Sequence, residues 1–507
     1  MPDTRRILVT GATGYVGGRL VPILLGRGDR VRCMVRDPRM LKNRWSDLAA
    51  DPWNLEVVQG DVLAPETLPQ ALEGVHTAYY LIHAMTAGER GFEQRDRLGA
   101  EAFGTIAAQA GVKRIIYLGG LGSRMAGTSP HLHSRHETGD ILRQSGVPVT
   151  ELRAAMIVGS GSASFEMLRN LTERLPVMVC PRWIDTRTQP IFIRDALAYL
   201  AEAVNVPETA GCIIDIGGPD VISYRQMMQI YAEVKGIHHF AVAVPLLTPR
   251  FSAYWCNWFT PVPASVAFPL IEGLKFETVC ENRLAEDLMP GVPRTPFKDA
   301  IRLALLAIDE ERVPTRWSDA VRGAIPVRLE DVPYPREDQL RDRKIKVTNV
   351  PAATLNRAFS RVGGEVGWYY ADWLWEIRGA IDRLVGGVGV RRGRRLPEQV
   401  EIGDAIDFWR VEDYSERRML LHAEMKVPGH AWLEFRILEI GHGQRALVQT
   451  AYYFPGSIWG YLYWFSLMPV HLFVFRGMLR KMLQWAEQQH QRDLALNDCL
   501  ADRTNQP

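Results

Sequence analysis

The sequence predicts an α/β chain: a doubly wound parallel sheet of the Rossmann type with a small capping region, joined to a smaller α+β unit. Three observations support this fold class. Short apolar runs alternate with helical stretches over residues 7–158, as parallel strands joined by crossover helices do. A glycine-rich turn directly follows the first run. From residue 344 the pattern changes to consecutive strands that end in one long helix.

The length of the chain predicts more than one domain. A single hydrophobic core stops growing at roughly 250–300 residues, and this chain has 507. We expect a first domain over 1–310, with a capping region at about 220–300, and a charged, proline-rich linker over 311–343. The second domain is expected over 344–490, followed by a tail over 491–507.

The first apolar run, 7–9, ends in a glycine-rich turn that leads into a helix. The helix shows as apolar residues spaced by three and four over 16–24. Glycines permit the tight turn and let the backbone approach a pyrophosphate, while the helix N-terminus offers free N–H groups to an anion. This arrangement predicts dinucleotide binding. The residues expected at the phosphates are Thr10, Gly11, Ala12, Thr13, Gly14, Tyr15, Val16 and Gly17.

The end of the second strand indicates which dinucleotide is bound. The apolar run 31–35 ends at Arg36, at the place that faces the adenosine ribose in such folds. An arginine there suits the 2′-phosphate of NADP, while the neighbouring Asp37 keeps NAD as an alternative. Asp61, with Val62 beside it, follows a third strand and is placed to reach the adenine edge. We therefore predict NADP as the cofactor.

Three more apolar runs complete the predicted sheet. They lie at 78–83, 114–120 and 153–159, and a helical stretch over 92–110 separates the first two. Strands that alternate with helices in this way form a parallel, doubly wound sheet.

Five segments carry a family resemblance: Thr-Gly-Ala-Thr-Gly-Tyr-Val-Gly at 10–17, Gly-Asp-Val at 60–62, Tyr-Leu-Gly-Gly-Leu-Gly at 117–122, and the segments 189–195 and 215–220. They resemble the short-chain dehydrogenase/reductase superfamily, and more narrowly its atypical and extended branch. That branch includes NmrA-like proteins and the accessory NADPH-binding subunit of respiratory complex I. The resemblance covers roughly 5–310 and implies an NAD(P)H-binding domain with oxidoreductase chemistry.

The chain departs from this family at the catalytic positions. The resemblance implies a serine after the fifth strand, then a tyrosine with a lysine four residues later. Here the serine place is taken by glycine at 119–120, the tyrosine place by Leu132 and the lysine place by His136. A leucine cannot transfer a proton, whereas imidazole titrates near neutral pH. The catalytic candidates are therefore His136, His133 and a displaced serine, Ser123; the alternative is a domain that binds the cofactor without turning it over.

Composition excludes several other classes. The net charge of +2 predicts no nucleic-acid partner. The six cysteines are scattered without a CxxC pair, which predicts neither a metal site nor a disulfide framework. The N-terminus runs directly into the first strand without a signal peptide, so we expect a cytoplasmic protein.

An aromatic segment over 245–274 lies on the substrate side of the first domain. It contains Phe251, Tyr254, Trp255, Trp258 and Phe259 between prolines, so it cannot form one long regular element. These rings either line an apolar cleft beside the nicotinamide or form the core of the capping helices, and the second alternative is favoured.

The second domain begins with a short helix at 354–359 and continues with strands at 401–411, 418–427, 431–440 and 446–454. A long helix follows from about 458 to 489. This order resembles the helix-grip fold of START-like proteins and polyketide cyclases, in which a curved sheet wraps a helix around an apolar cavity. Together, the two domains resemble a bacterial family of two-domain NAD(P)-binding proteins.

The terminal helix also offers a membrane alternative. Residues 446–475 carry no charge, and 458–475 are almost wholly apolar, but 18 such residues are short for a span, which needs about 20. We expect a helix buried over a lipid cavity, with peripheral membrane contact as the alternative. The arginines at 391–395 and the basic residues after 475 would attract anionic headgroups.

Two functions follow from these features. The first is an NADP-dependent oxidoreductase of a lipophilic carbonyl, alkene or quinone-like small molecule, in which the protein positions the nicotinamide and excludes water. The second is a non-catalytic NADPH-binding redox sensor or assembly factor with a lipid-binding C-terminal domain.

Overall fold

The computed structural model divides into two compact units, 1–325 and 326–507, and each is described by itself. The residues that it describes are 5–41, 44–45, 54–83, 92–122, 129–244, 259–310, 313–319, 340–385, 387–389, 394, 399–441 and 443–504.

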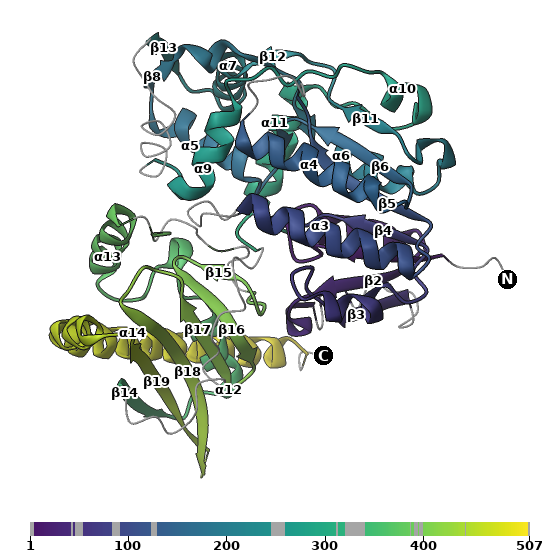
Figure 1. Cartoon of the computed structure of the whole chain (residues 1–507). Coiled ribbons are helices and arrows are strands. Elements are labelled where there is room, and N and C mark those ends of the chain that lie inside the picture. Colours follow the sequence, from purple (N-terminus) through teal and green to yellow (C-terminus); the bar gives the residue numbers. More distant parts are fainter. Residues whose placement is uncertain are drawn as a thin grey trace. The chain divides into compact units, whose positions relative to one another are not determined.

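The first unit is built on a seven-stranded sheet in the order β11-β6-β5-β4-β1-β2-β3, with every neighbouring pair parallel (Figure 1). The strand order reverses between β1 and β4, which makes the carboxyl edge there the usual ligand site of an open α/β sheet. The predicted α/β doubly wound fold is confirmed. The strands are β1 (Arg6–Thr10), β2 (Arg30–Val35), β3 (Leu55–Gln59), β4 (Thr77–Tyr80), β5 (Arg114–Gly120), β6 (Val149–Ala154) and β11 (Ile213–Ile216).

Helices cover both faces of this sheet. Each face packs against its helices through a separate hydrophobic cluster. Helices α3 and α4 lie side by side on one face (Figure 1), where Gly104 of α3 leaves room for Ser145 just after α4. The helices of the unit are α1 (Gly17–Gly26), α2 (Leu68–Leu72), α3 (Phe92–Gln109), α4 (Pro130–Gln144), α5 (Ala163–Arg174), α6 (Ile193–Ala203), α7 (Tyr224–Lys235), α9 (Ala264–Gly273), α10 (Leu284–Leu288) and α11 (Phe297–Asp309).

One predicted strand is displaced. The expected strand at 153–159 is in fact β6, which ends at Ala154, and a separate two-residue strand β7 (Ile157–Val158). β7 leaves the main sheet and pairs with β10 (Ile191–Phe192). The apolar run therefore spans two strands that belong to different sheets, and hydrophobicity alone does not reveal the boundary between them.

The capping region adds two further small sheets. β8 (Val177–Pro181) pairs with β13 (Phe240–Val244) in parallel, and β9 (Arg187–Thr188) pairs with β12 (Ile222–Ser223). Of the predicted aromatic segment, Phe251, Tyr254, Trp255 and Trp258 lie outside the described residues. Its last part forms α9, whose Val266 and Ile271 are buried in the core.

The predicted linker, 311–343, is shorter in the structure at both ends. Residues 313–319 pack on the first unit, where Thr315 is fully buried. The Thr315 hydroxyl accepts a hydrogen bond from Arg19 Nε at 2.8 Å and donates one to the Tyr15 carbonyl at 2.9 Å. At the other end, a strand of the second unit already begins at Leu340.

The second unit holds a six-stranded antiparallel sheet in the order β14-β19-β18-β17-β16-β15. The predicted antiparallel strands are confirmed, while the likeness to a START-type helix-grip fold stays a prediction. The elements are β14 (Leu340–Thr348), α12 (Ala352–Ser360), α13 (Asp372–Leu384), β15 (Ala405–Ile406), β16 (Trp409–Ser415), β17 (Arg418–Ala423), β18 (Gly429–Gly441), β19 (Gln444–Pro455) and α14 (Ile458–Thr504).

Helix α14 differs from the expected helix in length and burial. It continues to Thr504, through the predicted tail. Its apolar part was expected to be buried, but only 28% of its most apolar 18-residue window is buried. Trp464 and Phe475 face the core, whereas Trp459 is 69% exposed. By length and composition α14 could cross a membrane, but one such helix is weak evidence of a span.

Candidate functional site

The glycine turn has the geometry of a phosphate cradle. Gly11 has a φ of +67°, a conformation that glycine adopts without strain. Its carbonyl accepts a hydrogen bond from Gly14 N at 2.9 Å. A Cβ at position 17 would overlap that same carbonyl oxygen, and a Cβ at position 11 would lie 2.7 Å from the Leu81 carbonyl oxygen. Side chains at these positions would open the turn.

The helix that follows is left open to an anion. Helix α1 begins at Gly17, and its N-cap residue, Val16, makes no side-chain cap hydrogen bond. Gly18 N donates to the Gly14 carbonyl and Arg19 N donates to the Val16 carbonyl, so it is the positive dipole end of the helix that favours an anion. These features fit a dinucleotide pyrophosphate.

The side chains of some predicted cofactor residues bond to or pack against other parts of the protein. The Thr10 hydroxyl donates to the Tyr79 carbonyl at 2.9 Å and accepts from Leu81 N at 3.1 Å, which ties β1 to β4. The Tyr15 ring stacks under Arg19, and burial raises the pKa of Tyr15 to about 12. Val62 and Ala12 are buried. Thr10 and Ala12 are fully buried, so these residues support the turn instead of offering a surface to a cofactor.

Arg36 and Asp61 face each other beyond the ends of β2 and β3. Burial lowers the pKa of Arg36, and the Asp61 carboxylate opposes that shift. Asp37, which had left NAD as an alternative, forms an ion pair with Arg39 at 3.0 Å. Arg36 is thus the residue at this place that is suited to bind a phosphate.

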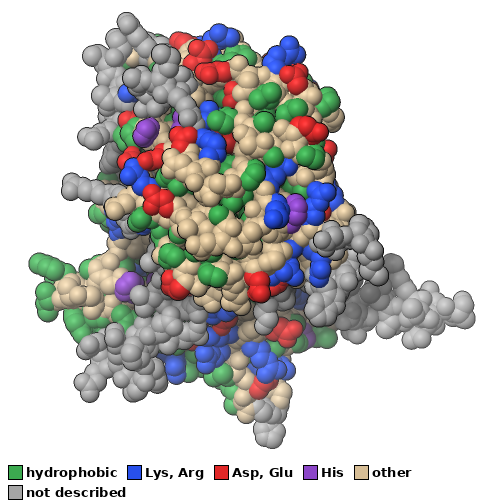
Figure 2. All heavy atoms as spheres, turned by 45° about the vertical axis from the view of Figure 1, so that its right-hand side comes forward, with side chains coloured by type: hydrophobic (Ala, Val, Ile, Leu, Met, Phe, Trp, Pro, Cys, Tyr) green, Lys and Arg blue, Asp and Glu red, His purple; other side chains and the backbone are tan. Residues whose placement is uncertain are grey.

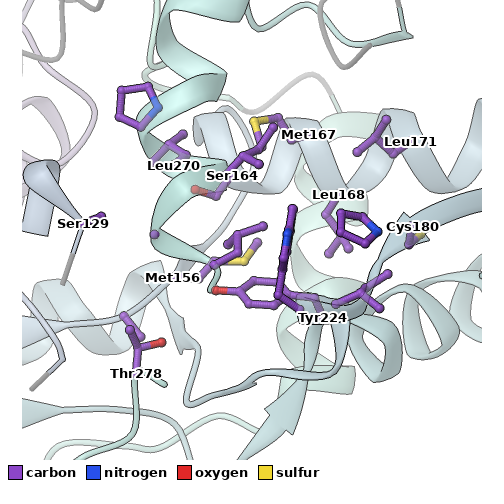
Figure 3. A pocket seen from close by; sticks show the side chains of 18 of the residues that line it. Ser129, Met156, Ser164, Met167, Leu168, Leu171, Cys180, Tyr224, Leu270 and Thr278 are labelled. Atoms are coloured by element: carbon purple, nitrogen blue, oxygen red, sulfur yellow. The ribbon is translucent and has the colours of Figure 1, made fainter. Parts of the chain in front are cut away.

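A partly enclosed cavity of about 470 Å³ lies at the carboxyl ends of β5 and β6. Gly120, Leu121 and the segment 154–156 form its sheet side. The opposite wall comes from the capping elements. In Figure 3, Met156, Met167, Leu168 and Leu171 surround the hollow together with Tyr224 and Leu270. The lining is mostly aliphatic and aromatic, with polar groups at a few places.

Those polar groups include Ser129, His131 and Arg135 at α4, Ser164 on α5, and Tyr224 with Thr278 on the capping side. Arg135 donates to the Leu118 carbonyl and lies over the Tyr117 ring. The Thr278 hydroxyl donates to the Thr188 hydroxyl at 2.7 Å. An apolar cavity with few polar groups is typical of a site for a lipophilic molecule.

The predicted catalytic residues are not gathered at this cavity. Ser123 lies outside the described residues. His133 is exposed on α4, and His136 is buried, with Nε2 3.1 Å from the Gly120 carbonyl oxygen. Neither histidine lines the cavity as the described residues define it. Their catalytic role stays a prediction.

A different histidine reaches the cavity, and sequence reasoning missed it. His131 Nδ1 lies 3.2 Å from His83 Nε2, and His83 Nδ1 lies 3.0 Å from Asp96 Oδ2. The Ser134 hydroxyl donates to the same carboxylate oxygen at 3.3 Å. The available signal was the position of His83, which follows β4 at the carboxyl edge of the sheet.

Among the described residues, no group of three or more histidine, cysteine, aspartate or glutamate side chains is arranged to hold a metal ion. The buried carboxylate of Glu151 is instead paired with Arg143 and Arg153. This ion cluster lies next to β5, because the Glu151 side chain also packs beside Gly119 of that strand.

Two family models match the chain. One is described as NAD(P)H-binding and matches residues 11–173. The other is described as a protein of unknown function, DUF2867, and matches residues 336–478. The cofactor of the first unit is therefore a nicotinamide dinucleotide, NAD(P)H.

Several known proteins match part of the chain. Ceramide reductase of Caulobacter vibrioides is 30% identical over 250 residues, which are 48% of this chain and 75% of that protein. Photosystem II assembly factor Ycf39 of Trieres chinensis is 24% identical over 217 residues, 42% of this chain and 63% of that protein. Among solved structures, Citrobacter triphenylmethane reductase with NADP(H) has 22% identity and a TM-score of 0.46, with 59% of this chain and 99% of that chain covered.

Proposed function

The chain belongs to the NAD(P)H-binding family of atypical short-chain dehydrogenases/reductases, and we propose that it is an NADP(H)-dependent reductase of a lipophilic carbonyl, alkene or quinone-like substrate. The observation that carries the proposal is the apolar cavity at the carboxyl ends of β5 and β6, on the same edge of the sheet as the glycine turn after β1. In such folds the dinucleotide lies across this edge.

The proposed division of labour follows the order of strands along that edge. Arg36 and Asp61, after β2 and β3, would hold the adenosine end, and the glycine turn after β1 would hold the pyrophosphate. The nicotinamide end would then lie toward β4 and β5, beside the cavity. When bound, the nicotinamide supplies the hydride; the protein positions the substrate and excludes water.

A lipophilic substrate is favoured by the cavity wall and by one relative. Methionine, leucine and tyrosine side chains line the hollow, and these gain by burying apolar ligand surface. The relative called ceramide reductase bears the name of a lipid substrate. A ketone or enone on a long-chain lipid is the substrate class that fits both facts best.

The test is oxidation of NADPH by the purified full chain against a panel of quinones, enones, long-chain ketones and aldehydes. We expect turnover of at least one lipophilic compound, and a Leu168→Trp variant should raise its KM about tenfold or more by filling the cavity, with NADPH affinity unchanged. Leu306→Trp is the matched control, since Leu306 is an exposed leucine of the same unit. NADPH binding without any turnover would overturn the enzyme proposal.

That last outcome would favour the second candidate, a non-catalytic NADPH-binding redox sensor or assembly factor. Leu132 at the family's tyrosine place supports it, as does the relative named as an assembly factor. The sensor predicts a partner whose affinity for the chain changes with NADPH, measurable by pull-down with and without the nucleotide.

We also propose that the second unit contacts an anionic lipid surface. Arg378 of α13 donates to the Tyr463 hydroxyl of α14 at 2.7 Å, and Tyr370, two residues before α13, contacts Phe473 of α14. Both helices also turn large apolar side chains outward, and Figure 2 shows such side chains projecting in green from the lower part of the molecule. The exposed residues are Trp373, Ile377, Ile381 and Leu384 on α13 and Ile458, Trp459, Leu462, Phe465 and Phe473 on α14.

Charge favours a membrane over a second copy of the chain as the partner of this face. The exposed residues Arg476, Arg480 and Lys481 follow the apolar part of α14 directly. Basic residues next to exposed tryptophan and leucine are typical of helices that lie in a lipid interface. A membrane location would bring the enzyme to a lipid substrate.

Flotation with vesicles of phosphatidylglycerol and phosphatidylcholine tests this. The full chain should float, and the double variant Trp459→Glu/Leu462→Glu should lose most of the binding. Phe240→Glu, which changes an exposed aromatic residue of the first unit, is the control. Equal flotation of both variants, or a concentration-dependent dimer that the double variant abolishes, would contradict the proposal.

A further inference from the structure

We propose that His131 is the proton donor and acceptor for the substrate in the cavity, and that His83 and Asp96 form a relay that positions it. This inference rests on the proposed function, and it names the group that replaces the family's tyrosine. The three side chains come from different elements: His131 from α4, Asp96 from α3, and His83 from the segment after β4.

The relay is continuous from His131 to Asp96, and its carboxylate end is buried. His131 Nδ1 and His83 Nε2 are 3.2 Å apart, and His83 Nδ1 and Asp96 Oδ2 are 3.0 Å apart. The side chain of Asp96 is 7% exposed. The far end of the relay is fixed further by the Ser134 hydroxyl, which donates to Asp96. His131 itself lines the cavity.

The hydrogen bonds assign the tautomers. A carboxylate only accepts, so His83 Nδ1 carries a proton toward Asp96. A neutral His83 then accepts at Nε2, and His131 must donate from Nδ1. The lone pair of His131 therefore lies on Nε2, and among the described residues no hydrogen bond to that atom is recorded. Because His131 lines the cavity, we infer that Nε2 is the base that it offers there.

The surroundings keep both rings neutral at rest. Burial lowers the pKa of His83 and lowers that of His131 well below its ordinary value, while Arg135 adds to both shifts. The Asp96 carboxylate opposes both shifts without overcoming them. Tyr80 and Tyr117 also face Asp96, and burial raises the pKa of each, so both stay protonated.

The position of His131 matches the place where a substrate oxygen would need a proton. The cavity wall joins His131 to Gly120 and Leu121 at the end of β5, on the side of the sheet where the nicotinamide end is proposed to lie. In carbonyl reduction, the carbonyl carbon takes the hydride and its two electrons from reduced nicotinamide. The oxygen takes the proton from protonated His131 Nε2, and the product is an alcohol with oxidised nicotinamide.

In the reverse direction the same groups move a proton outward. The alcohol proton passes to His131 Nε2, the Nδ1 proton of His131 passes to His83 Nε2, and the Nδ1 proton of His83 moves toward Asp96. Because the resting site carries the base form, reduction at neutral pH requires proton uptake. Its rate should fall about tenfold for each pH unit above the pKa of His131, while alcohol oxidation shows the opposite trend.

The kinetic test compares variants in NADPH oxidation with whichever carbonyl compound the wild type reduces. His131→Gln should lower kcat about 100-fold or more and flatten the pH profile, with NADPH affinity unchanged. Asp96→Asn and His83→Gln should lower kcat less and shift the profile. His238→Gln, an exposed histidine of the same unit, should match the wild type. A His131→Gln variant with a wild-type rate and profile would overturn the proposal while the reductase function stands.

A second measurement needs neither substrate nor a folded variant. Diethyl pyrocarbonate modifies only unprotonated imidazole, and mass spectrometry resolves each histidine of the wild-type chain. His131 should still react at pH values where an ordinary imidazole is already protonated. A bound long-chain ketone analogue should slow its modification. If His131 does not react, or follows the pH dependence of an ordinary imidazole, the relay is wrong, even if the chain proves to be a reductase. If no panel compound is reduced but His131 reacts as expected, the reductase function fails and the relay geometry stands.

Discussion

The two units use their apolar side chains in opposite ways. In the first unit, aliphatic and aromatic residues surround a cavity of about 470 Å³ at the carboxyl edge of the sheet. In the second unit, aromatic rings pack against one another in the core. The ring centroid of Phe408 lies 5.5 Å from that of Trp409 and 5.9 Å from that of Trp375, and Trp368 stacks on Trp375 with centroids 4.9 Å apart. The second unit instead exposes apolar residues on α13 and α14.

This difference agrees with the proposed roles of the two units, ligand binding in the first and surface attachment in the second. A protein interior is normally packed as densely as an organic crystal, so a hollow that stays lined with apolar groups marks a place for a ligand. A filled core with apolar residues left outside marks a contact surface. Hydrophobicity along the chain looks alike in both units, and only packing tells the two uses apart.

The largest expected effect tests the packing difference directly. Phe408→Ala should destabilise the second unit by about 3–5 kcal/mol, because Phe408 is fully buried among other rings. Leu168→Ala should cost the first unit less than about 2 kcal/mol, because one side of Leu168 already borders the cavity. Urea unfolding followed by hydrogen exchange and mass spectrometry measures each unit by its own peptides. Equal costs would mean that the cavity is packed like a core.

The second prediction concerns the other open space of the first unit, the phosphate cradle. Gly17→Ala should weaken NADPH binding about 100-fold, near 2.8 kcal/mol, because the added Cβ would overlap the Gly11 carbonyl oxygen. Gly26→Ala, at the other end of the same helix, meets no atom within 4 Å and should bind NADPH normally. Titration calorimetry checks both variants. Full affinity in Gly17→Ala would remove the glycine turn from the cofactor site.

How far the sequence predicts the structure depends on how local each signal is. The glycine turn and the apolar strands of the first unit lie in short segments, so the parallel sheet could be predicted. β14 was missed because it is an edge strand with the sequence Leu-Arg-Asp-Arg-Lys-Ile-Lys-Val-Thr, and charged residues are common on edges. Its composition resembles a linker, and only pairing with β19 reveals the strand.

The candidate site follows the same rule. Residues of the cofactor cradle are neighbours in sequence, whereas His83 and His131 are separated by 48 positions and meet only through the packing of α4 against the sheet. His136 was the better candidate by alignment to the family's lysine, yet its ring hydrogen-bonds to the backbone of Gly120. An alignment fixes the place along the helix but not which side of the helix faces the cavity.

The third prediction uses pH to probe the filled core of the second unit. Burial lowers the pKa of His471 to about 4 from its ordinary value of 6.5, helped by Arg378 and Lys344 and opposed by Asp342. The unfolded chain therefore binds a proton at higher pH than the folded one, and stability falls as pH drops from about 6.5 toward 4. At pH 5 this histidine should cost about 2 kcal/mol relative to pH 7.5.

His471→Phe removes that cost, because a phenyl ring preserves the packing of His471 against Phe475 and Trp464. Urea unfolding at both pH values should show a smaller loss for the variant by about that amount. His422, whose pKa is also lowered to about 4, remains in both proteins, so the difference between them isolates His471. An unchanged pH dependence would show that water already reaches His471 in the folded core.

The smallest expected effect decides between the two dinucleotides. Arg36→Gln should weaken NADPH binding about tenfold, near 1.4 kcal/mol, and leave NADH affinity unchanged, because only NADPH carries the 2′-phosphate. Arg30→Gln, at the amino end of the same strand β2, removes the same charge from the edge opposite the cofactor and should change neither affinity. If both nucleotides weaken equally in Arg36→Gln, the arginine supports the adenosine pocket in general and does not select the phosphate. Arg39 cannot replace it without breaking its ion pair with Asp37, so the discrimination should be lost with Arg36 alone.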